Sequence, residues 1–567
     1  MHQTSNNGLR EWGSATWPRV LFWSVITALS LATAYAVFVA TFRVDLPGLY
    51  YDEMLFVPPA FFVLGQCGNF DTISMHLGDC FPILIGPIYL GALKAYLYAP
   101  LLAVFSVSPQ VIRLPASLLA ILTAVLSYRF FVPRLGLIFA ALAAVFLLTS
   151  PVFLWHARVD WGPFVIAVTC RFLVLAFVIR WLENARPDDL IGAGAAFMAG
   201  LFDKLNFAWL LPPLIAATLL VYPREAYGAV KTRWRSILLV VIIFGGLGLV
   251  FLIYSILPAL RLQIYPRAES LMANANRVMR LLDVTFSGSA QFKFMFTSPF
   301  PERTRLGDIF FGQITIGTML IAILVIFRRK LIVKPALWSV AKLVIFLHVG
   351  LLGSIAVLLA SPDATGSHHA VFLLPLLAYD AAALLKAVDV IGQLFGRLAR
   401  RGATAIVVVL ALSVIGEQIR VGLPYINALQ RNTHAYRPNF TPAIYALAET
   451  VAQLPATYVI SVDWGTHMQL VSLAPSDRRE RYRDYWPFFK DLKLPGRQTN
   501  PIMDLVGFGT NAVFVEKPEA LAVFPKTIRN FETALGTLPP CAIVERKNDG
   551  FDSSVFTVVT VRNDCRK

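Results

Sequence analysis

The sequence has few charged residues for its length. Of its 567 residues, 15% are Asp, Glu, Lys or Arg, 57% are hydrophobic, and the mean hydropathy is +0.64. Soluble globular domains carry about a quarter charged residues. Runs of about 20 apolar residues recur along the chain, and each is long enough to cross a hydrocarbon core of about 30 Å. The composition therefore excludes an ordinary soluble protein and indicates a polytopic membrane protein.

Cysteine is scarce, and its spacing excludes the common metal and redox motifs. The five cysteines form no CxxC pair and accompany no His-rich tract, so no zinc site is predicted. Cys67 and Cys80 fall in the first loop, and Cys541 and Cys565 flank the last predicted hairpin. Two disulfides fit an oxidising compartment, although spacing leaves their pairing open. Cys170 lies in an apolar run and is interpreted as a small apolar filler.

Two further absences restrict the function. The chain has no Gly-rich GK[ST] loop, which argues against ATP-driven transport and soluble nucleotide chemistry. It also has no internal repeat of the kind found in many secondary transporters. The net charge of +16 does not indicate a nucleic-acid partner. Much of it lies in short loops between apolar runs, where Lys and Arg set membrane orientation.

The apolar runs predict about eleven transmembrane helices. The first is too long for a signal-peptide core of about 7–15 residues and is expected to be a retained span with a cytoplasmic N-terminus. The expected spans are 19–41, 112–133, 135–154, 163–182, 188–203, 207–222, 236–258, 306–327, 336–360, 369–390 and 402–422. Residues 81–105 are also apolar, but a crossing there would place the later basic clusters outside. They are predicted to be a helix pair at the outer membrane surface.

The basic clusters predict which loops are cytoplasmic. They are Arg129 and Arg134; Arg180 and Arg186; Arg224 with Lys231, Arg233 and Arg235; Arg328 to Lys330 with Lys334; and Arg397, Arg400 and Arg401. Four polar islands then fall together on the outer face: Asp52-Glu53, 155–163, 202–207 and 363–375. Ionisable groups at membrane depth are costly and usually functional. Their shared face predicts one site in a plasma membrane, which we expect to be a bacterial inner membrane.

The pattern changes after residue 423, where charges become frequent and long apolar runs stop. Four short β-branched segments, "TYVISVDWG", "NAVFVEK", "CAIVERK" and "SSVFTVVTVR", predict strands, and 518–536 predicts a helix. We expect a transmembrane module over 1–423, with a first outer loop at 42–111 and interfacial helices. Residues 424–567 are expected to form an outer α/β domain.

Several motifs of the membrane part together resemble a known family. The Asp-Glu pair after the first helix, "RLPASLLAILTAVLSYRF" at 113–130, "SPVFLWHARVD" at 150–160, "GLFDKLNFAWLLPP" at 200–213 and "HHAVFLLPLLAYDAA" at 368–382 occur in the family's order and spacing. Over about residues 15–425 the chain resembles the GT-C glycosyltransferases. Within them it is most similar to the PMT-like, family 39 group of protein O-mannosyltransferases and lipid A aminoarabinose transferases.

The resemblance implies that a sugar is transferred from a polyprenyl-phosphate donor to an acceptor hydroxyl on the outer face. The acceptor would be a lipid, a glycan or a protein. Such a substitution needs a base for the acceptor proton, and the leaving phosphate needs a nearby cation. One carboxylate acting by direct displacement predicts inversion at the sugar carbon. No cofactor is required by the sequence, and a divalent cation is left open.

The resemblance also implies roles for individual residues. Asp52 matches the catalytic base, Glu53 would orient the acceptor or the loop, and Asp160 matches a second acid. The expected substrate-binding residues are Lys204, which would contact the donor phosphate, together with His368, His369, Arg158 and Arg113. The histidines stand where the family often has Arg-Tyr, and a basic residue before paired prolines is missing at "CFPIL".

Other interpretations stay open. Asp160 could pair with Arg158, Lys204 with Asp203, the histidines could simply begin a helix, and Arg113 could anchor a helix end. The alternative function is a polytopic lipid or solute transporter or flippase with an outer accessory domain. A structural or assembly protein would leave the clustering of polar islands unexplained.

Overall fold

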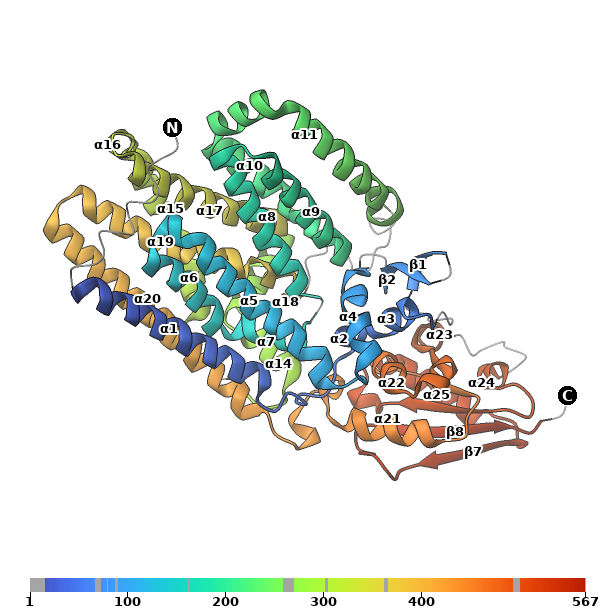
Figure 1. Cartoon of the computed structure of the whole chain (residues 1–567). Helices are drawn as coiled ribbons and strands as arrows, with labels where there is room; N and C mark the ends of the chain where they lie inside the picture. The colour runs from blue at the N-terminus through green and yellow to red at the C-terminus, as the bar shows by residue number, and fades with distance from the viewer. Residues whose placement is uncertain are drawn as a thin grey trace.

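A computed structural model describes residues 16–66, 73–78, 80–86, 90–161, 163–257, 270–300, 304–361, 366–492 and 500–565. It is a bundle of long helices with a sheet-containing domain against one end (Figure 1). The membrane-protein fold expected from the sequence is thus confirmed, and so is the C-terminal α/β region.

Eight of the described helices are long and apolar enough to cross a membrane. They are α1 (Thr16–Thr41), α5 (Pro109–Leu135), α8 (Val165–Asn184), α11 (Pro223–Phe251), α15 (Leu306–Ile326), α17 (Pro335–Ala360), α19 (Leu374–Leu394, continuous with α18, Ser367–Ala370) and α20 (Arg397–Ala428). Each corresponds to one of the spans expected from hydropathy.

The other three expected spans are irregular. A bend of 56° separates α6 (Leu137–Thr149) from α7 (Pro151–Val159), because Pro151 cannot donate to the preceding turn. Helix α9 (Pro187–Asp203) has 17 residues, and the next segment divides into η2 (Leu205–Leu210) and α10 (Leu211–Val221). The described helices of crossing length therefore number eight, or nine with the bent pair, rather than about eleven.

The helix pair predicted at 81–105 is wrong in its first half. Residues 81–85 form β2 (Phe81–Ile85), which pairs antiparallel with β1 (Ile73–Leu77) and β3 (Leu90–Gly91). Only the second half is a helix, α4 (Leu93–Val104). At 12 residues it is about 18 Å long, too short for a span of about 30 Å. Backbone pairing of a short β-branched and apolar run prevailed over helix propensity here.

Short helices occupy the loops beside the C-terminal domain. The first loop folds as α2 (Tyr51–Met54) and α3 (Val57–Val63). The long loop after α11 contains the amphipathic α13 (Leu271–Phe286) and α14 (Ser289–Met295), and α13 packs on α15, α17 and α18. Arg261, Arg267 and Arg303 of this loop lie outside the described residues.

The C-terminal domain begins where α20 ends, at Ala428, and its sheet has the strand order β5-β4-β6-β8-β7. The strands β4 (Tyr458–Ser461), β5 (Tyr482–Asp484) and β6 (Asn511–Glu516) run parallel, whereas β8 (Thr557–Asn563) is antiparallel to β6 and β7 (Ala542–Lys547). The helices are α21 (Ala443–Gln453), α22 (His467–Leu473), α23 (Trp486–Asp491), α24 (Pro501–Leu505) and α25 (Pro525–Gly536). The four predicted strands and the predicted helix are all present.

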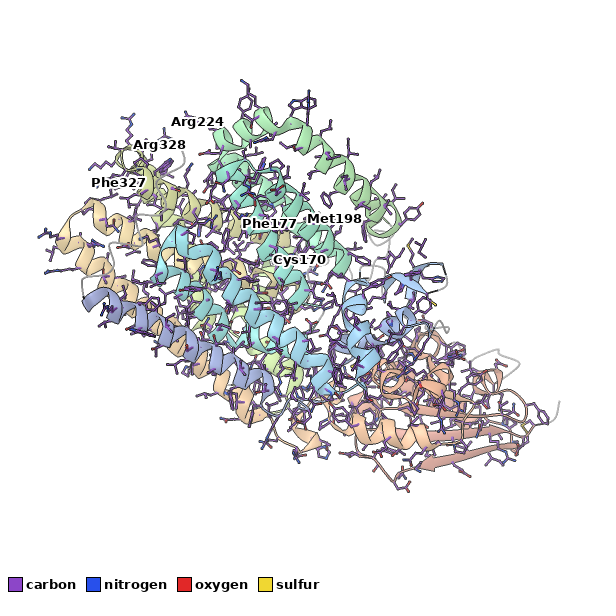
Figure 2. The ribbon with its side chains drawn as sticks, viewed as in Figure 1. Cys170, Phe177, Met198, Arg224, Phe327 and Arg328 are labelled. Carbon is purple, nitrogen blue, oxygen red and sulfur yellow. A yellow bond between two sulfur atoms is a disulfide. The ribbon has the colours of Figure 1, made fainter. Side chains whose placement is uncertain are left out.

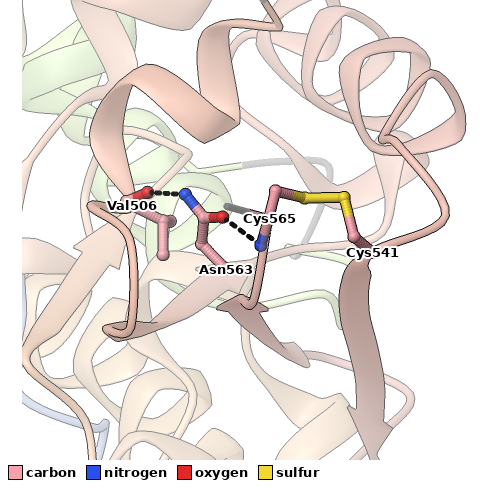
Figure 3. Close-up of a disulfide and its surroundings, with 4 residues drawn as sticks. All are labelled: Val506, Cys541, Asn563 and Cys565. Carbon is pink, nitrogen blue, oxygen red and sulfur yellow. Dashed lines mark hydrogen bonds between the residues drawn. A yellow bond between two sulfur atoms is a disulfide. The ribbon is translucent and has the colours of Figure 1, made fainter. Parts of the chain in front are cut away.

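One disulfide closes this domain. Cys541 and Cys565 are joined, and the Cys565 amide donates to Asn563, whose own amide donates to the Val506 carbonyl at 2.7 Å (Figure 3). Cys80 is also disulfide-bonded, and Cys67 lies outside the described residues. Cys170 is a free, buried thiol within the bundle on α8, as expected (Figure 2).

The basic clusters and the polar islands lie at opposite ends of the bundle. Arg224 and Arg328 lie at the end away from the C-terminal domain (Figure 2). The connectivity agrees, because α5 starts near Arg113 and ends at Arg134, and α20 starts at Arg397 and ends at the domain. The separation has the form that the positive-inside rule predicts, with the polar islands on the face that carries the domain.

Candidate functional site

The structure brings the four polar islands together. Asp52 comes from α2, and Asp160 follows the last turn of α7. Lys204 lies in the break between α9 and η2, and His368 lies on α18. Asp52 and Asp160 both interact electrostatically with Lys204, as does His368. The expected site residues thus meet at the end of the bundle that adjoins the C-terminal domain.

Glu53 and Arg113 form a buried pair that holds the first loop. Arg113 Nε and Nη2 donate to the two Glu53 carboxylate oxygens at 2.9 and 2.6 Å, and the Tyr50 amide donates to Oε1 at 2.6 Å. The remaining guanidinium N–H groups donate to the carbonyls of Val44, Pro47 and Gly48. The expected substrate role of Arg113 stays a prediction. Its donors are used within the loop, and Glu53 orients that loop.

Arg158 has a comparable structural role. Its side chain is fully buried, and its guanidinium donates to the carbonyls of Val39, Phe42, Arg43 and Leu46, where α1 ends. A cation at a helix C-terminus satisfies orphan carbonyls and complements the helix dipole. Arg158 therefore binds the end of α1 in this structure, and its expected substrate contact stays a prediction.

Asp160 pairs with a lysine that the sequence did not suggest. Its Oδ1 accepts from the amides of Phe164 and Val165 at 2.8 and 2.9 Å, where α8 begins. Its Oδ2 lies 2.5 Å from Nζ of Lys94 on α4, not beside Arg158. Both oxygens are thus engaged, and both side chains are buried. Asp160 fixes α4 and α8 beside Asp52, so a direct substrate contact is not supported by this geometry.

Lys204 is positioned by a close approach between two segments. An isolated antiparallel bridge joins it to Leu90, and a Cβ on Gly91 would lie 1.7 Å from the Phe202 carbonyl oxygen. Only glycine lets β3 approach the end of α9 so closely. The lysine is 1% exposed, and its Nζ lies 5.4 Å from the centroid of the Phe372 ring. Burial lowers the Lys204 pKa to about 8, although Asp52 opposes this shift.

Asp52 is half-buried at the edge of this cluster. Burial raises its pKa to about 6, while Lys204 and a side-chain hydrogen bond from Trp161 oppose the rise. Trp161 is itself held by stacking on Phe294, with ring centroids 4.2 Å apart and planes within 10°. Asp52 therefore has a cation on one side and an N–H donor on another, which is an arrangement suited to a base that works near neutral pH.

The two histidines join the site through aromatic contacts. The His368 ring lies 5.5 Å from Trp161, His369 lies 5.8 Å from Trp209, and the two imidazoles are 4.1 Å apart. Among the described residues, neither Nδ1 atom has a hydrogen-bond partner. Both rings therefore keep a nitrogen that a polar ligand could use.

Two further ionisable residues lie in this cluster: Asp203, considered from the sequence only as a partner of Lys204, and Arg171, which was not singled out. Asp203 is fully buried next to Lys204, and neither carboxylate oxygen has a hydrogen-bond partner among the described residues. Arg171 lies on α8 between the rings of Phe207 and Phe372, at 5.2 and 4.8 Å. The position of Arg171 within an apolar run could have identified it from the sequence, because ionisable groups at membrane depth are usually functional.

The described residues contain no group of three or more His, Cys, Asp or Glu side chains arranged to hold a metal ion. Lysine and arginine side chains lie in the site, among them Lys94, Lys204 and Arg171.

Residues 91–252 match the family model described as dolichyl-phosphate-mannose-protein mannosyltransferase. None of the curated proteins compared matches the chain. The structure of ArnT from Cupriavidus metallidurans in the apo state aligns with 14% identity over 95% of this chain and 98% of that one, with a TM-score of 0.48. The apo oligosaccharyltransferase of Archaeoglobus fulgidus aligns with 13% identity over 92% of this chain and 69% of that one, with a TM-score of 0.51.

The family-model match confirms, over residues 91–252, the resemblance to the PMT-like group that the motifs indicated. The family-model match covers α4 to α11 and includes Lys94, Arg113, Asp160, Asp203 and Lys204. The likeness to the archaeal structure extends the shared fold to most of the chain.

Proposed function

We propose that this chain is a membrane glycosyltransferase that moves a sugar from a polyprenyl-phosphate donor to an acceptor hydroxyl, with Asp52 as the base. The observation that carries the proposal is the position of Asp52. It is the half-buried carboxylate of the cluster, next to a buried lysine, at the end of the bundle that carries the C-terminal domain. We place this end on the outer face of the membrane.

The reaction follows from these groups by direct displacement. Asp52 takes the proton of the acceptor hydroxyl, whose oxygen attacks the anomeric carbon as the bond to the phosphate oxygen breaks. The anomeric centre inverts, the proton remains on Asp52, and the polyprenyl phosphate leaves with the electron pair. Burial keeps water away from the cluster and strengthens each electrostatic interaction within it.

We assign the donor phosphate to the cationic side chains near Asp52. Lys204 is the principal contact, and Arg171 is close enough to influence its charge. His368 and His369 both interact electrostatically with Lys204 and retain unsatisfied Nδ1 atoms among the described residues. An anionic phosphate would balance this positive charge, which explains why the chain retains costly buried cations here.

The proposal is tested by the product. Membranes containing the chain are incubated with radiolabelled polyprenyl-phosphate sugars, and the label is followed into lipid, glycan and protein fractions. We expect label in a new glycosidic bond, with loss of label from the polyprenyl phosphate. Movement of intact labelled lipid between leaflets, with no new bond, would contradict the proposal and favour the transporter alternative.

One buried acid–histidine pair bears on that alternative. His348 on α17 and Asp380 on α19 form a buried pair at 3.2 Å within the bundle. Gln313 donates to Asp380 at 2.9 Å, and Thr318 lies 3.2 Å from the other imidazole nitrogen. Intramembrane acid–histidine pairs can mark proton pathways. Here each of these groups is satisfied by its neighbours, so we assign the network to holding α15, α17 and α19 together.

A further inference from the structure

The C-terminal domain contacts the residue that precedes the candidate base. The loop after β4 brings Trp464 against Tyr51, the residue before Asp52, with ring centroids 4.8 Å apart and planes inclined by 40°. In the same contact, the Gln469 amide on α22 donates to the Leu49 carbonyl at 3.4 Å. An aromatic pair built from two distant parts of the chain therefore includes the residue that precedes Asp52.

Hydrogen bonds hold the backbone around Trp464 in place. Lys517 Nζ donates to the Trp464 carbonyl at 3.3 Å and to the Asp463 carboxylate at 3.2 Å. Asp463 also accepts from the amides of Val523 and Phe524. Gly465 then turns the chain with φ of 90°, a conformation that favours glycine. Trp464 and Tyr51 nevertheless remain only half-buried. A pre-positioned aromatic surface loses little entropy when it binds a ligand.

From this arrangement we propose that Tyr51 and Trp464 form the acceptor platform, and that the acceptor presents a pyranose ring. The inference rests on the proposed function and adds the class of acceptor. The C–H face of a pyranose is apolar and positively polarised, so it stacks on the electron-rich face of an aromatic ring. A ring seated there presents its hydroxyls to Asp52, the next residue in the chain.

The sheet argues against a peptide acceptor at this position. An extended peptide is commonly bound by adding a strand to an exposed sheet edge. Strand β4, which delivers Trp464, is paired on both sides, with β5 and β6. Strand β4 therefore has no free edge for a peptide, whereas the two aromatic side chains are partly exposed.

Ligand-observed saturation-transfer NMR on the full chain in nanodiscs tests the platform. The probes are the methyl glycosides of glucose, galactose, mannose and N-acetylglucosamine, with a Ser/Thr tripeptide as the competing class. We expect at least one glycoside to receive saturation, and Trp464→Leu to weaken its binding about fivefold or more, since an aromatic ring is removed. Trp464→Phe, which keeps a ring, should retain most of the signal.

The matched control is Trp486→Leu, because Trp486 is a half-buried tryptophan of the same domain that stacks on Phe524 instead of Tyr51. Asp52→Asn should keep glycoside saturation while it loses transfer, which separates this inference from the proposed function. No glycoside signal, or a signal unchanged in Trp464→Leu, would overturn the platform. A tripeptide signal that depends on Trp464 would overturn the choice of a sugar ring.

Discussion

At the residue scale, Trp161 influences how readily Asp52 holds a proton. A hydrogen bond to a carboxylate stabilises its ionised form, so Trp161→Phe should raise the Asp52 pKa above its present value of about 6. A base is active when ionised, and the acid limb of kcat/KM should therefore move to higher pH. The phenyl ring can still stack on Phe294, so the fold should persist.

The measurement is the pH profile of sugar transfer for Trp161→Phe and for Trp23→Phe, a control on the exposed surface of α1. An acid limb that stays in place in Trp161→Phe, while the rate falls, would mean that Trp161 only supports the fold.

The residue types of the site were predictable, but several of their partners were not. Asp52, Lys204 and His368 stood out because polar residues interrupt apolar runs on one predicted face. Arg113 and Arg158 stood out for the same reason, yet they bind loop and helix-end carbonyls, and sequence cannot distinguish such a cation from one that binds a ligand. The basic clusters predicted the segment of Lys94 at the membrane surface, and the sequence could not show that Lys94 pairs with the distant Asp160.

At the element scale, the β2–β3 hairpin sets the position of Lys204. Gly91→Ala would place a Cβ 1.7 Å from the Phe202 carbonyl oxygen, so β3 must move away from the end of α9. We expect a loss of about 1–3 kcal/mol in stability together with weaker binding of polyprenyl phosphate. Thermal unfolding in detergent and binding of radiolabelled polyprenyl phosphate measure the two effects.

The control is Gly228→Ala in α11, where an added Cβ meets no atom within 4 Å. Alanine is the better helix former, so this variant should be neutral or slightly stabilised. Equal behaviour of the two variants would show that the approach of β3 does not position Lys204.

Hydropathy identified every long helix, because an apolar run of about 20 residues has few alternatives to a span. It was wrong at 81–85, where a short apolar run pairs as β2. Periodicity alone cannot separate such a strand from a piece of helix. Hydropathy also could not show that one span bends at Pro151, or that the helix ending at Asp203 is followed by a break at Lys204. These breaks depend on tertiary packing.

At the scale of the whole molecule, the account requires the polar site and the C-terminal domain to share the outer face. Single cysteines at two exposed positions, Arg400→Cys and Glu480→Cys, can be treated in intact cells with a membrane-impermeant maleimide. The cysteine at 480 should be labelled, and the one at 400 should be protected until the cells are permeabilised. The reverse pattern would place the site inside the cell and would contradict the proposal that the donor binds at the outer face.

The contact of the C-terminal domain with the site was not predictable. The strands of the domain were recognisable from β-branched segments. Nothing in "SVDWGTH", however, indicates that Trp464 packs on Tyr51, because most of the membrane part separates the two residues in sequence. Such a contact depends on the orientation of the domain. The end of α20 and the close approach of Gly48 to Thr441 set that orientation. A Cβ on Gly48 would lie 2.1 Å from the Thr441 carbonyl oxygen.

Asp52 is proposed as the base, and Lys204 as the residue that binds the donor phosphate. This assignment is tested most directly by measuring turnover and polyprenyl-phosphate-sugar binding for Asp52→Asn and Lys204→Ala in the same nanodiscs. Asp52→Asn keeps size and removes charge, so turnover should fall by about 10²–10⁴-fold or more while donor binding survives. Lys204→Ala should instead weaken donor binding. Near-normal turnover in Asp52→Asn would contradict the account.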